Sequence, residues 1–266
     1  MATKHNWPSD IQPLLKKYSG KPHPLEYKNL YQLLVMVVLS AQDSDKNINN
    51  RAPELFKVYP NMEALSHATE DTLQPFLKSI RNGRNKAKWL IGISNTLKKD
   101  KNIPLNQEEL TKLSGIGRKS ANVIMREAKV KAEGVIVDLH VVRVAPRLGI
   151  TQSEDPKKIE ADIMAAVPQK DWGETGMAIS FLGREICRPK DPLHSECPMN
   201  SVCDLYAQVK SGKAKSPAKK STLKKMTVAK AEKKPVKKTV AKKAAVKKPA
   251  PKKTGAKKKA SPKKKK

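Results

Sequence analysis

Two glycines and the basic residues after them form the stretch of this chain with the clearest chemical potential. Gly115 and Gly117 separate two segments with helical patterning, and glycine lets the backbone adopt positive φ and a ligand approach the main-chain amides. A helix that begins near Arg118 would present unpaired amides and the positive end of its dipole at this turn. The sequence therefore predicts a phosphate site beside Arg118 and Lys119.

A second group of reactive residues is crowded near position 200: Cys187, His194, Cys197 and Cys203. Three cysteines in so short a stretch argue against a disulfide framework and favour an intracellular metal site. One imidazole and three thiolates suit an iron–sulfur cluster, and a Cys3His set also suits structural zinc. A degenerate site that holds no metal is the third possibility.

The elements that position these residues are predicted to be helices. No stretch alternates convincingly with period two, so the folded part of the chain is expected to be all-α. Asn106, with Glu109 three residues later, is expected to cap the helix before the glycine turn. Other helices are expected over residues 13–18, 27–39, 47–59, 69–78, 86–97, 118–128, 139–148, 156–167 and 172–185, with 27–39 as a central buried helix.

Charge is distributed very unevenly along the 266 residues. The formal net charge is +30, of which residues 211–266 carry +23 and residues 1–210 only +7. We expect this lysine-rich tail, which is similar to the tails of linker histones, to be disordered and to bind a polyanion such as nucleic acid. A solvated charge run that aids solubility is the alternative.

Nothing in the sequence indicates a membrane or an export route. No run approaches the roughly 18 apolar residues of a membrane span, and the N-terminus lacks the apolar core of a signal peptide. The expected location is therefore inside the cell and on DNA, in the cytoplasm or nucleoid, or in the nucleus of a eukaryote.

Two motifs together resemble a known family. Residues 113–121 read LSGIGRKSA, and residues 137–140 read VDLH. This pair is similar to the helix-hairpin-helix of the endonuclease III family of DNA glycosylases, whose pattern is LPGVGxKTA followed by VDTH. The resemblance covers about residues 27–206. It implies an all-α, two-domain fold and a base excision DNA repair enzyme that also cleaves abasic sites.

The resemblance assigns the catalytic roles to Lys119 and Asp138. Lys119 would attack the sugar C1′, displace an oxidised pyrimidine and form a Schiff base that leads to β-elimination. Asp138 would stabilise oxocarbenium character or assist proton transfer. The structural alternatives are a phosphate contact for Lys119, an N-cap for Asp138 and an ordinary surface or core histidine for His140.

The resemblance also predicts DNA contacts on two loops. In SAQDSD, Gln42 would fill the space left by an extruded base, and Asp45 would lie near the lesion pocket or simply cap the next helix. Asn82 occupies the position of a leucine that wedges into the duplex in the family, and Arg84 would contact phosphate or plug the gap. A plain basic surface loop is the alternative. Further DNA contacts are expected at the hairpin and beyond it: Gly115, Gly117, Arg118 and His140.

The expected layout has four parts. An N-terminal segment, residues 1–20, is expected to pack with the C-terminal half. A helical barrel, residues 21–134, carries the hairpin at about 107–128. A second domain, residues 135–210, carries the metal loop at 187–203, and the tail follows at 211–266. The family spacing C-x6-C-x2-C-x5-C, with His194 in place of one cysteine, favours a [4Fe-4S] cluster over zinc or no metal. A monomer that binds damaged double-stranded DNA across the two domains is expected.

Two other functions are consistent with the sequence. One is a helix-hairpin-helix glycosylase for oxidised purines or mismatches, because the lysine and aspartate are shared across that superfamily. The other is a catalytically weak protein that binds or compacts DNA through its tail, for which Asn82 and His194 leave room. The presence of both Lys119 and Asp138 favours the enzyme.

Overall fold

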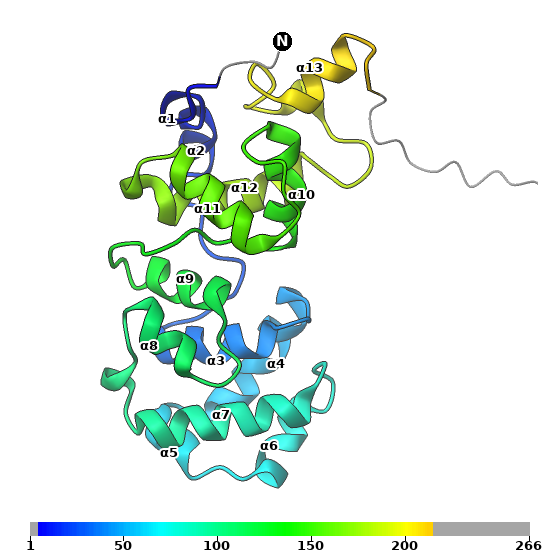
Figure 1. Cartoon of the computed structure of the whole chain (residues 1–266). Helices are drawn as coiled ribbons and strands as arrows, with labels where there is room; N and C mark the ends of the chain where they lie inside the picture. Colours follow the sequence, from blue (N-terminus) through cyan, green and yellow to red (C-terminus); the bar gives the residue numbers. More distant parts are fainter. Residues whose placement is uncertain (1–4, 215–266) are drawn as a thin grey trace, which may run out of the picture. The chain divides into compact units, whose positions relative to one another are not determined.

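The computed structural model describes residues 5–214, so the predicted disordered tail lies outside the described residues beyond position 214. Within this part of the chain every regular element is an α-helix or a short 3-10 helix, which confirms the all-α prediction (Figure 1). No helix between residues 5 and 214 has the length and apolarity that a bilayer crossing would need.

Helices α3 to α9 pack on one another, and we call them the hairpin group. Helix α3 is at its centre, since every residue from Leu33 to Leu39 is buried and α3 contacts α4, α7 and α9. The group comprises α3 Leu30–Ser40, α4 Asp45–Val58, α5 Met62–Ser66, α6 Glu70–Leu77, α7 Gly83–Leu97, the 3-10 turn Asp100–Asn102, α8 Gln107–Lys112 and α9 Arg118–Glu127.

The remaining helices surround α12, and we call them the α12 group. Residues 175–183 of α12 are all buried, and this helix contacts both α2 and α10 (Figure 1). The α12 group comprises α1 Trp7–Asp10, α2 Gln12–Tyr18, α10 Leu139–Leu148, α11 Pro156–Ala166, α12 Trp172–Glu185 and α13 Asp204–Lys210, with 3-10 turns at Gln169–Asp171 and His194–Glu196. Contacts between α9 and α12 join the two groups.

The helix boundaries differ from the sequence prediction where capping residues decide them. Helix α3 begins at Leu30 rather than at residue 27, because the side chain of Asn29 accepts a hydrogen bond from the amide of Gln32. Helix α4 begins at Asp45, and Ser44 caps it by accepting from the Asn47 amide, so the capping role considered for Asp45 belongs to its neighbour. The short helices α1, α5 and α13 were not predicted, since four to seven residues give little periodic signal.

Candidate active site and DNA-binding cleft

The glycine turn has the backbone geometry that the sequence indicated. Gly115 has φ of +79°, and a Cβ atom there would lie 2.6 Å from Cε3 of Trp89, so any side chain would be strained and would collide with the indole. Gly117 is the N-cap of α9, and a Cβ atom built on it meets nothing within 4 Å. The first amides of α9 are therefore open to an anionic ligand.

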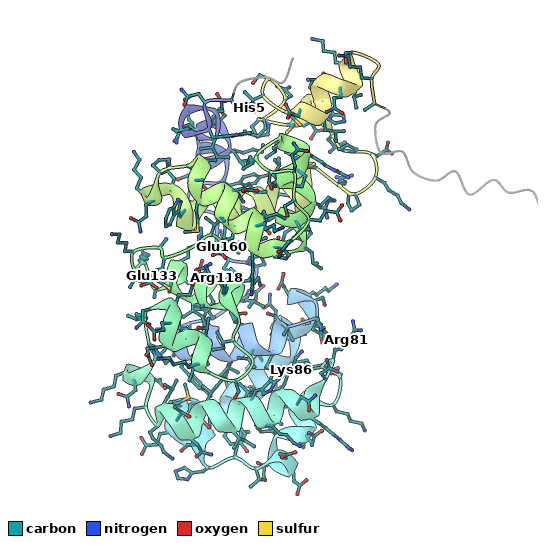
Figure 2. The ribbon with its side chains drawn as sticks, viewed as in Figure 1. His5, Arg81, Lys86, Arg118, Glu133 and Glu160 are labelled. Carbon is teal, nitrogen blue, oxygen red and sulfur yellow. The ribbon has the colours of Figure 1, made fainter. Side chains whose placement is uncertain are left out.

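Arg118 makes an internal ion pair beside this turn. Its Nε donates to Oε2 of Glu160 at 2.8 Å, and Figure 2 shows the two side chains meeting between α9 and α11. Glu160 is buried and also accepts hydrogen bonds from the side chain of Asn122 and the amide of Val135. The Arg118 side chain remains 47% exposed, so it ties α9 to α11 while almost half of its surface is open to solvent.

A cleft of about 1200 Å³ contains the two predicted catalytic residues. Residues of both helical groups line it, including Gln42, Asp45, Lys119, Asp138, His140 and Arg184. Four helices, α4, α9, α10 and α11, begin at this cleft, so four positive helix ends lie along it. A cavity of similar volume, between α1–α2 and the ends of α9 and α12, has a lining of mixed charge and none of the predicted catalytic or DNA-binding residues.

Lys119 lies on the first turn of α9 and has a lowered pKa. The residue exposes surface to the cleft, but protein atoms crowd its ammonium group at the back, where a cavity of about 20 Å³ adjoins it. Burial of the amine lowers the pKa of Lys119, Asp138 and Asp45 raise it, and Arg184 lowers it again. Only the amine titrates, so its crowding lowers the pKa of Lys119 even though the residue as a whole is exposed.

Asp138 is both an N-cap and a member of a polar cluster in the cleft. Its Oδ1 accepts from the amides of His140 at 2.8 Å and Val141 at 2.9 Å, which confirms the predicted capping interaction. Its Oδ2 accepts from the hydroxyl of Ser180 at 2.6 Å. These bonds hold the carboxylate in one orientation at the start of α10, on the cleft that Lys119 also lines.

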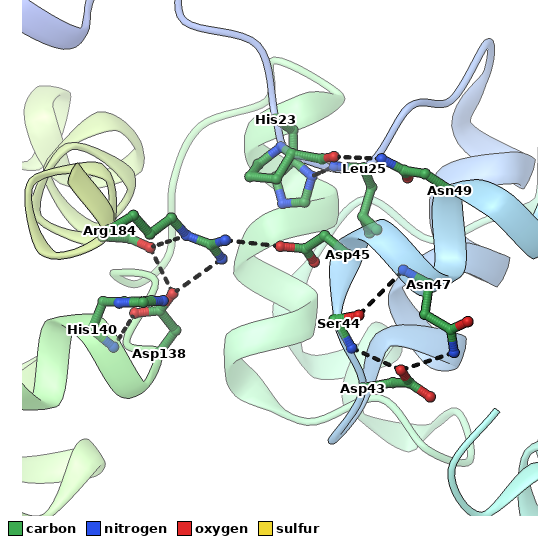
Figure 3. Close-up of polar contacts among 12 residues, drawn as sticks. His23, Leu25, Asp43, Ser44, Asp45, Asn47, Asn49, Asp138, His140 and Arg184 are labelled. Atoms are coloured by element: carbon green, nitrogen blue, oxygen red, sulfur yellow. Dashed lines mark hydrogen bonds and ion pairs between the residues drawn. The ribbon is translucent and has the colours of Figure 1, made fainter.

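Arg184 links the two helical groups inside the cleft. Its guanidinium group donates to Asp45 at 2.9 Å and lies 3.9 Å from Asp138, as Figure 3 shows. Asp45 belongs to the hairpin group and Asp138 to the α12 group, so this arginine bridges residues far apart in the sequence. The sequence did not single out Arg184 as a residue of the cleft, although it lies only three positions before Cys187.

His23 is another residue that the sequence did not single out. It lines the small cavity behind Lys119, and its Nδ1 accepts from the amide of Leu25 at 3.1 Å (Figure 3). Burial lowers the pKa of His23 to about 4, and the charge of Lys119 contributes to this lowering. His23 is therefore neutral at physiological pH and leaves its other ring nitrogen, Nε2, as a donor.

The two loops predicted to contact DNA are joined to each other. Gln42 and Asn82 are both non-glycine residues with positive φ, at 59° and 57°. The side-chain nitrogen Nδ2 of Asn82 donates to Oε1 of Gln42 at 3.4 Å. The carboxylate of Asp43 accepts from the amide of Arg81 at 2.8 Å. Unusual backbone conformations held by neighbouring structure are typical of functional loops.

A buried lysine supports this pair of loops from below. Lys86, labelled in Figure 2, is 1% exposed. It donates to the carbonyl oxygens of Leu39 at 2.8 Å and Ala41 at 2.7 Å. It caps the end of α3 directly before Gln42. Because α7 begins at Gly83 rather than at residue 86, Arg84 lies on the exposed first turn of a helix and not in a loop.

His140 has a hydrogen-bonding partner within its own helix. It lines the cleft, and its Nδ1 accepts from Nη2 of Arg143 at 3.2 Å. Burial lowers the pKa of His140, so the ring is neutral at physiological pH.

The four predicted metal ligands line one small apolar cavity beside α10 and α12. They do not converge there, since within residues 5–214 no three His, Cys, Asp or Glu side chains are grouped as a metal site. The His194 ring stacks on Tyr206 with centroids 4.9 Å apart, and Cys203 donates to the carbonyl oxygen of Arg147 at 3.2 Å. Three thiols and an imidazole in an apolar shell are a donor set that fits a thiolate-bound metal.

The sequence matches the family model of the HhH-GPD superfamily of base excision DNA repair proteins over residues 35–169. Endonuclease III of Synechocystis sp. is 38% identical over 206 residues, covering 76% of this chain and 94% of that protein. Endonuclease III of Bacillus subtilis is 37% identical over 182 residues, covering 67% of this chain and 83% of that protein. A solved structure of a trapped endonuclease III–DNA covalent intermediate has a TM-score of 0.68 and 30% identity, and covers 75% of this chain and 95% of that one.

The chain therefore belongs to the HhH-GPD superfamily of base excision DNA repair proteins and, within it, to the endonuclease III family. Members of this family generally carry a [4Fe-4S] cluster. As a member, the chain is a DNA glycosylase and abasic-site lyase of base excision repair.

Proposed function

We propose that this enzyme removes oxidised pyrimidines from double-stranded DNA, with Lys119 as the nucleophile and Asp138 as its carboxylate partner. The observation that carries the proposal is that both residues lie at the first turns of two helices, α9 and α10, and line the same cleft. The lowered pKa of Lys119 supports it, because only the neutral amine can attack carbon. The target nucleotide leaves the base stack before it reaches this cleft.

The chemistry follows from these two groups. The lone pair of the Lys119 amine forms a bond to C1′ as the N-glycosidic bond breaks, and the departing base takes up a proton. Asp138 stabilises the positive charge that develops on the sugar. Ring opening turns the C1′–N linkage into a Schiff base, which acidifies the C2′ hydrogen. Loss of that proton supplies the electron pair that expels the 3′ phosphate, and water then releases the lysine.

The DNA contacts are assigned to three places in the structure. We propose that Gln42 and Asn82, which are joined by their side chains, occupy the gap in the duplex, with Arg84 on the backbone nearby. The amides after Gly115 and Gly117, together with the exposed part of Arg118, bind phosphate. Asp45 and His140 face the extruded nucleotide from the lining of the cleft.

Trapping with borohydride tests the mechanism directly. Wild-type protein on duplexes that contain an abasic site or an oxidised pyrimidine should give a covalent adduct, and Lys119→Gln should give none. Lys57→Gln is a matched control, since Lys57 is an exposed lysine near the end of α4, away from the cleft. An adduct that survives Lys119→Gln excludes Lys119 as the nucleophile.

The same assay separates the alternative functions. An enzyme specific for oxidised purines or mismatches would form adducts with those duplexes faster than with oxidised pyrimidines. A catalytically weak DNA-binding protein would bind all of them without forming an adduct or cleaving the strand. We expect oxidised pyrimidines to react fastest.

We propose that Cys187, His194, Cys197 and Cys203 hold a [4Fe-4S] cluster. When bound, the cluster would supply a cross-link within the loop at 187–203, and it would lie against apolar residues of α10 and α12 that line the same cavity. Metal and sulfide analysis of the purified protein tests this. Iron with an equal amount of acid-labile sulfide supports the cluster, whereas zinc alone, or no metal, contradicts it. Cys197→Ala should lose the iron and lower the thermal stability.

The expected context of this activity is a monomer on double-stranded DNA inside the cell. Relatives named endonuclease III, and two solved structures of endonuclease III with DNA, support the choice of partner. Size-exclusion chromatography with and without a lesion duplex checks the one-to-one stoichiometry.

A further inference from the structure

Leu139 is the most exposed large apolar residue within residues 5–214. Its exposure is 84%, compared with 54% for Val58 and 43% for Leu105. Single exposed apolar residues are ordinary on protein surfaces, and Val58 and Leu105 need no explanation. Leu139 differs from them in position, because it follows Asp138 directly and lines the cleft that contains Lys119.

The fold makes little use of this leucine side chain. Leu139 is the first residue of α10, where a side chain leans toward the N-terminal end of the helix and away from its buried face. The cap of α10 is supplied by Asp138, and the helix is anchored by Val141, Val144 and other buried residues. The side chain of Leu139 therefore contributes little to the stability of the fold.

The chemistry proposed above would bring a nucleotide next to Leu139. If Lys119 bonds to C1′ while Asp138 acts on the same sugar, the extruded nucleotide must fill the cleft beside the residue next to Asp138. Much of the remaining lining is polar, including Gln42, Asp45 and Arg184. Leu139 is thus the exposed apolar side chain that the nucleotide would cover.

We propose that Leu139 is a specificity-determining residue that stabilises the extrahelical nucleotide by apolar contact with its sugar and base. This contact would offset part of the cost of unstacking, a task for which apolar side chains are suited and for which Asn82 is not. The inference depends on the proposed function, because it assumes that the nucleotide enters this cleft.

Two readouts test the proposal. In single-turnover assays, Leu139→Ala should slow base excision from a duplex with a paired oxidised pyrimidine about tenfold. Lyase trapping on a preformed abasic site should change less than about threefold, because no base remains to be held. Leu105→Ala should change neither rate. Leu139 is exposed, so the variant should fold, and circular dichroism checks this.

Extrusion is also measured without chemistry. In the Lys119→Gln background, a duplex with 2-aminopurine at the target position should brighten on binding, and adding Leu139→Ala should remove most of that signal at equal occupancy. The proposal is overturned if excision and brightening are unchanged, or if abasic-site trapping falls as much as excision does. A wild-type protein that traps no abasic site would instead refute the proposed function, while the brightening would still report on Leu139.

Discussion

The reactivity of Lys119 depends on opposing electrostatic influences in the cleft. Burial and the charge of Arg184 lower its pKa, while Asp138 and Asp45 raise it. Arg184 also neutralises those two carboxylates by pairing with both. We therefore propose that Arg184 acts as a positioning residue. It lowers the pKa of Lys119 directly, and it also weakens the two negative charges that raise that pKa.

Replacing Arg184 should move the pH dependence of the reaction. In Arg184→Met the pKa of Lys119 rises, because a nearby positive charge is lost and two carboxylates are left unpaired. A higher pH is then needed to form the neutral amine, so the rate of adduct formation at pH 7 falls. The pH at which this rate rises shifts to a higher value. Trapping rates on abasic DNA between pH 6 and 10 measure this. Arg51→Met, on the exposed surface of α4, is the control. An unchanged pH–rate profile in Arg184→Met would contradict the role given to Arg184.

His23 should make the stability of the fold depend on pH. Its pKa is about 4 in the folded protein and 6.5 in the unfolded chain, so between these values the unfolded state binds more protons. The contribution of neutral His23 to the free energy of unfolding is therefore fully present above about pH 6.5. It is lost as the pH falls toward 4, and the loss is at most about 3 kcal/mol. His23→Asn keeps a hydrogen-bond acceptor for the Leu25 amide but does not titrate. Urea unfolding at pH 7 and pH 5 should show a smaller loss in the variant than in the wild type.

Among the secondary-structure elements, the hairpin of α8 and α9 uses its two glycines for different purposes. Gly115 serves the fold, because it combines positive φ with contact against Trp89. For Gly117 we propose a role in ligand binding, because it has an ordinary φ of −96° and open space beside it. The two positions are two residues apart and form a natural pair of variants.

Alanine at each glycine should separate folding from binding. Gly115→Ala should lower the free energy of unfolding by at least about 1 to 2 kcal/mol, since the left-handed conformation is strained and Trp89 must move. Gly117→Ala should cost less than about 1 kcal/mol but weaken DNA binding several-fold, because a methyl group obstructs phosphate at the amides of α9. Thermal unfolding and fluorescence anisotropy with duplex DNA measure the two effects. Equal stability losses would contradict this division of roles.

For the molecule as a whole, the distribution of charge separates the enzyme body from the tail. Residues 1–210 carry a formal charge of +7 and residues 211–266 carry +23. The residues proposed to be catalytic all lie within residues 1–210. We therefore expect the tail to raise non-specific affinity for DNA and to leave the chemical step unchanged.

Removal of residues 215–266 should flatten the salt dependence of DNA binding. Each phosphate neutralised by a lysine adds about 0.9 to the slope of log K against log salt. The truncated protein retains every described helix, so its single-turnover rate at saturating enzyme should match that of the full chain. Replacing the tail by a Gly/Ser segment of equal length controls for chain length. An unchanged slope would show that the tail does not contact DNA.

Local features of this protein were accessible from the sequence. The helical periodicity, the caps at Asn106 and Asp138 and the special role of Gly115 are visible because hydrogen bonds and steric limits within a turn involve residues a few positions apart. The motif around Lys119 and Asp138 was visible for the same reason. These features sufficed for the fold class and the family.

The composition of the cleft was decided by tertiary packing. Arg184 meets Asp45 across 139 positions, and His23 comes to lie behind Lys119. Packing also directs Arg118 toward Glu160 and leaves Leu139 exposed beside Asp138. No periodicity or spacing in the sequence encodes these contacts, because they form only when helices from distant parts of the chain pack together. That packing also determines which charged groups share a site of low dielectric constant.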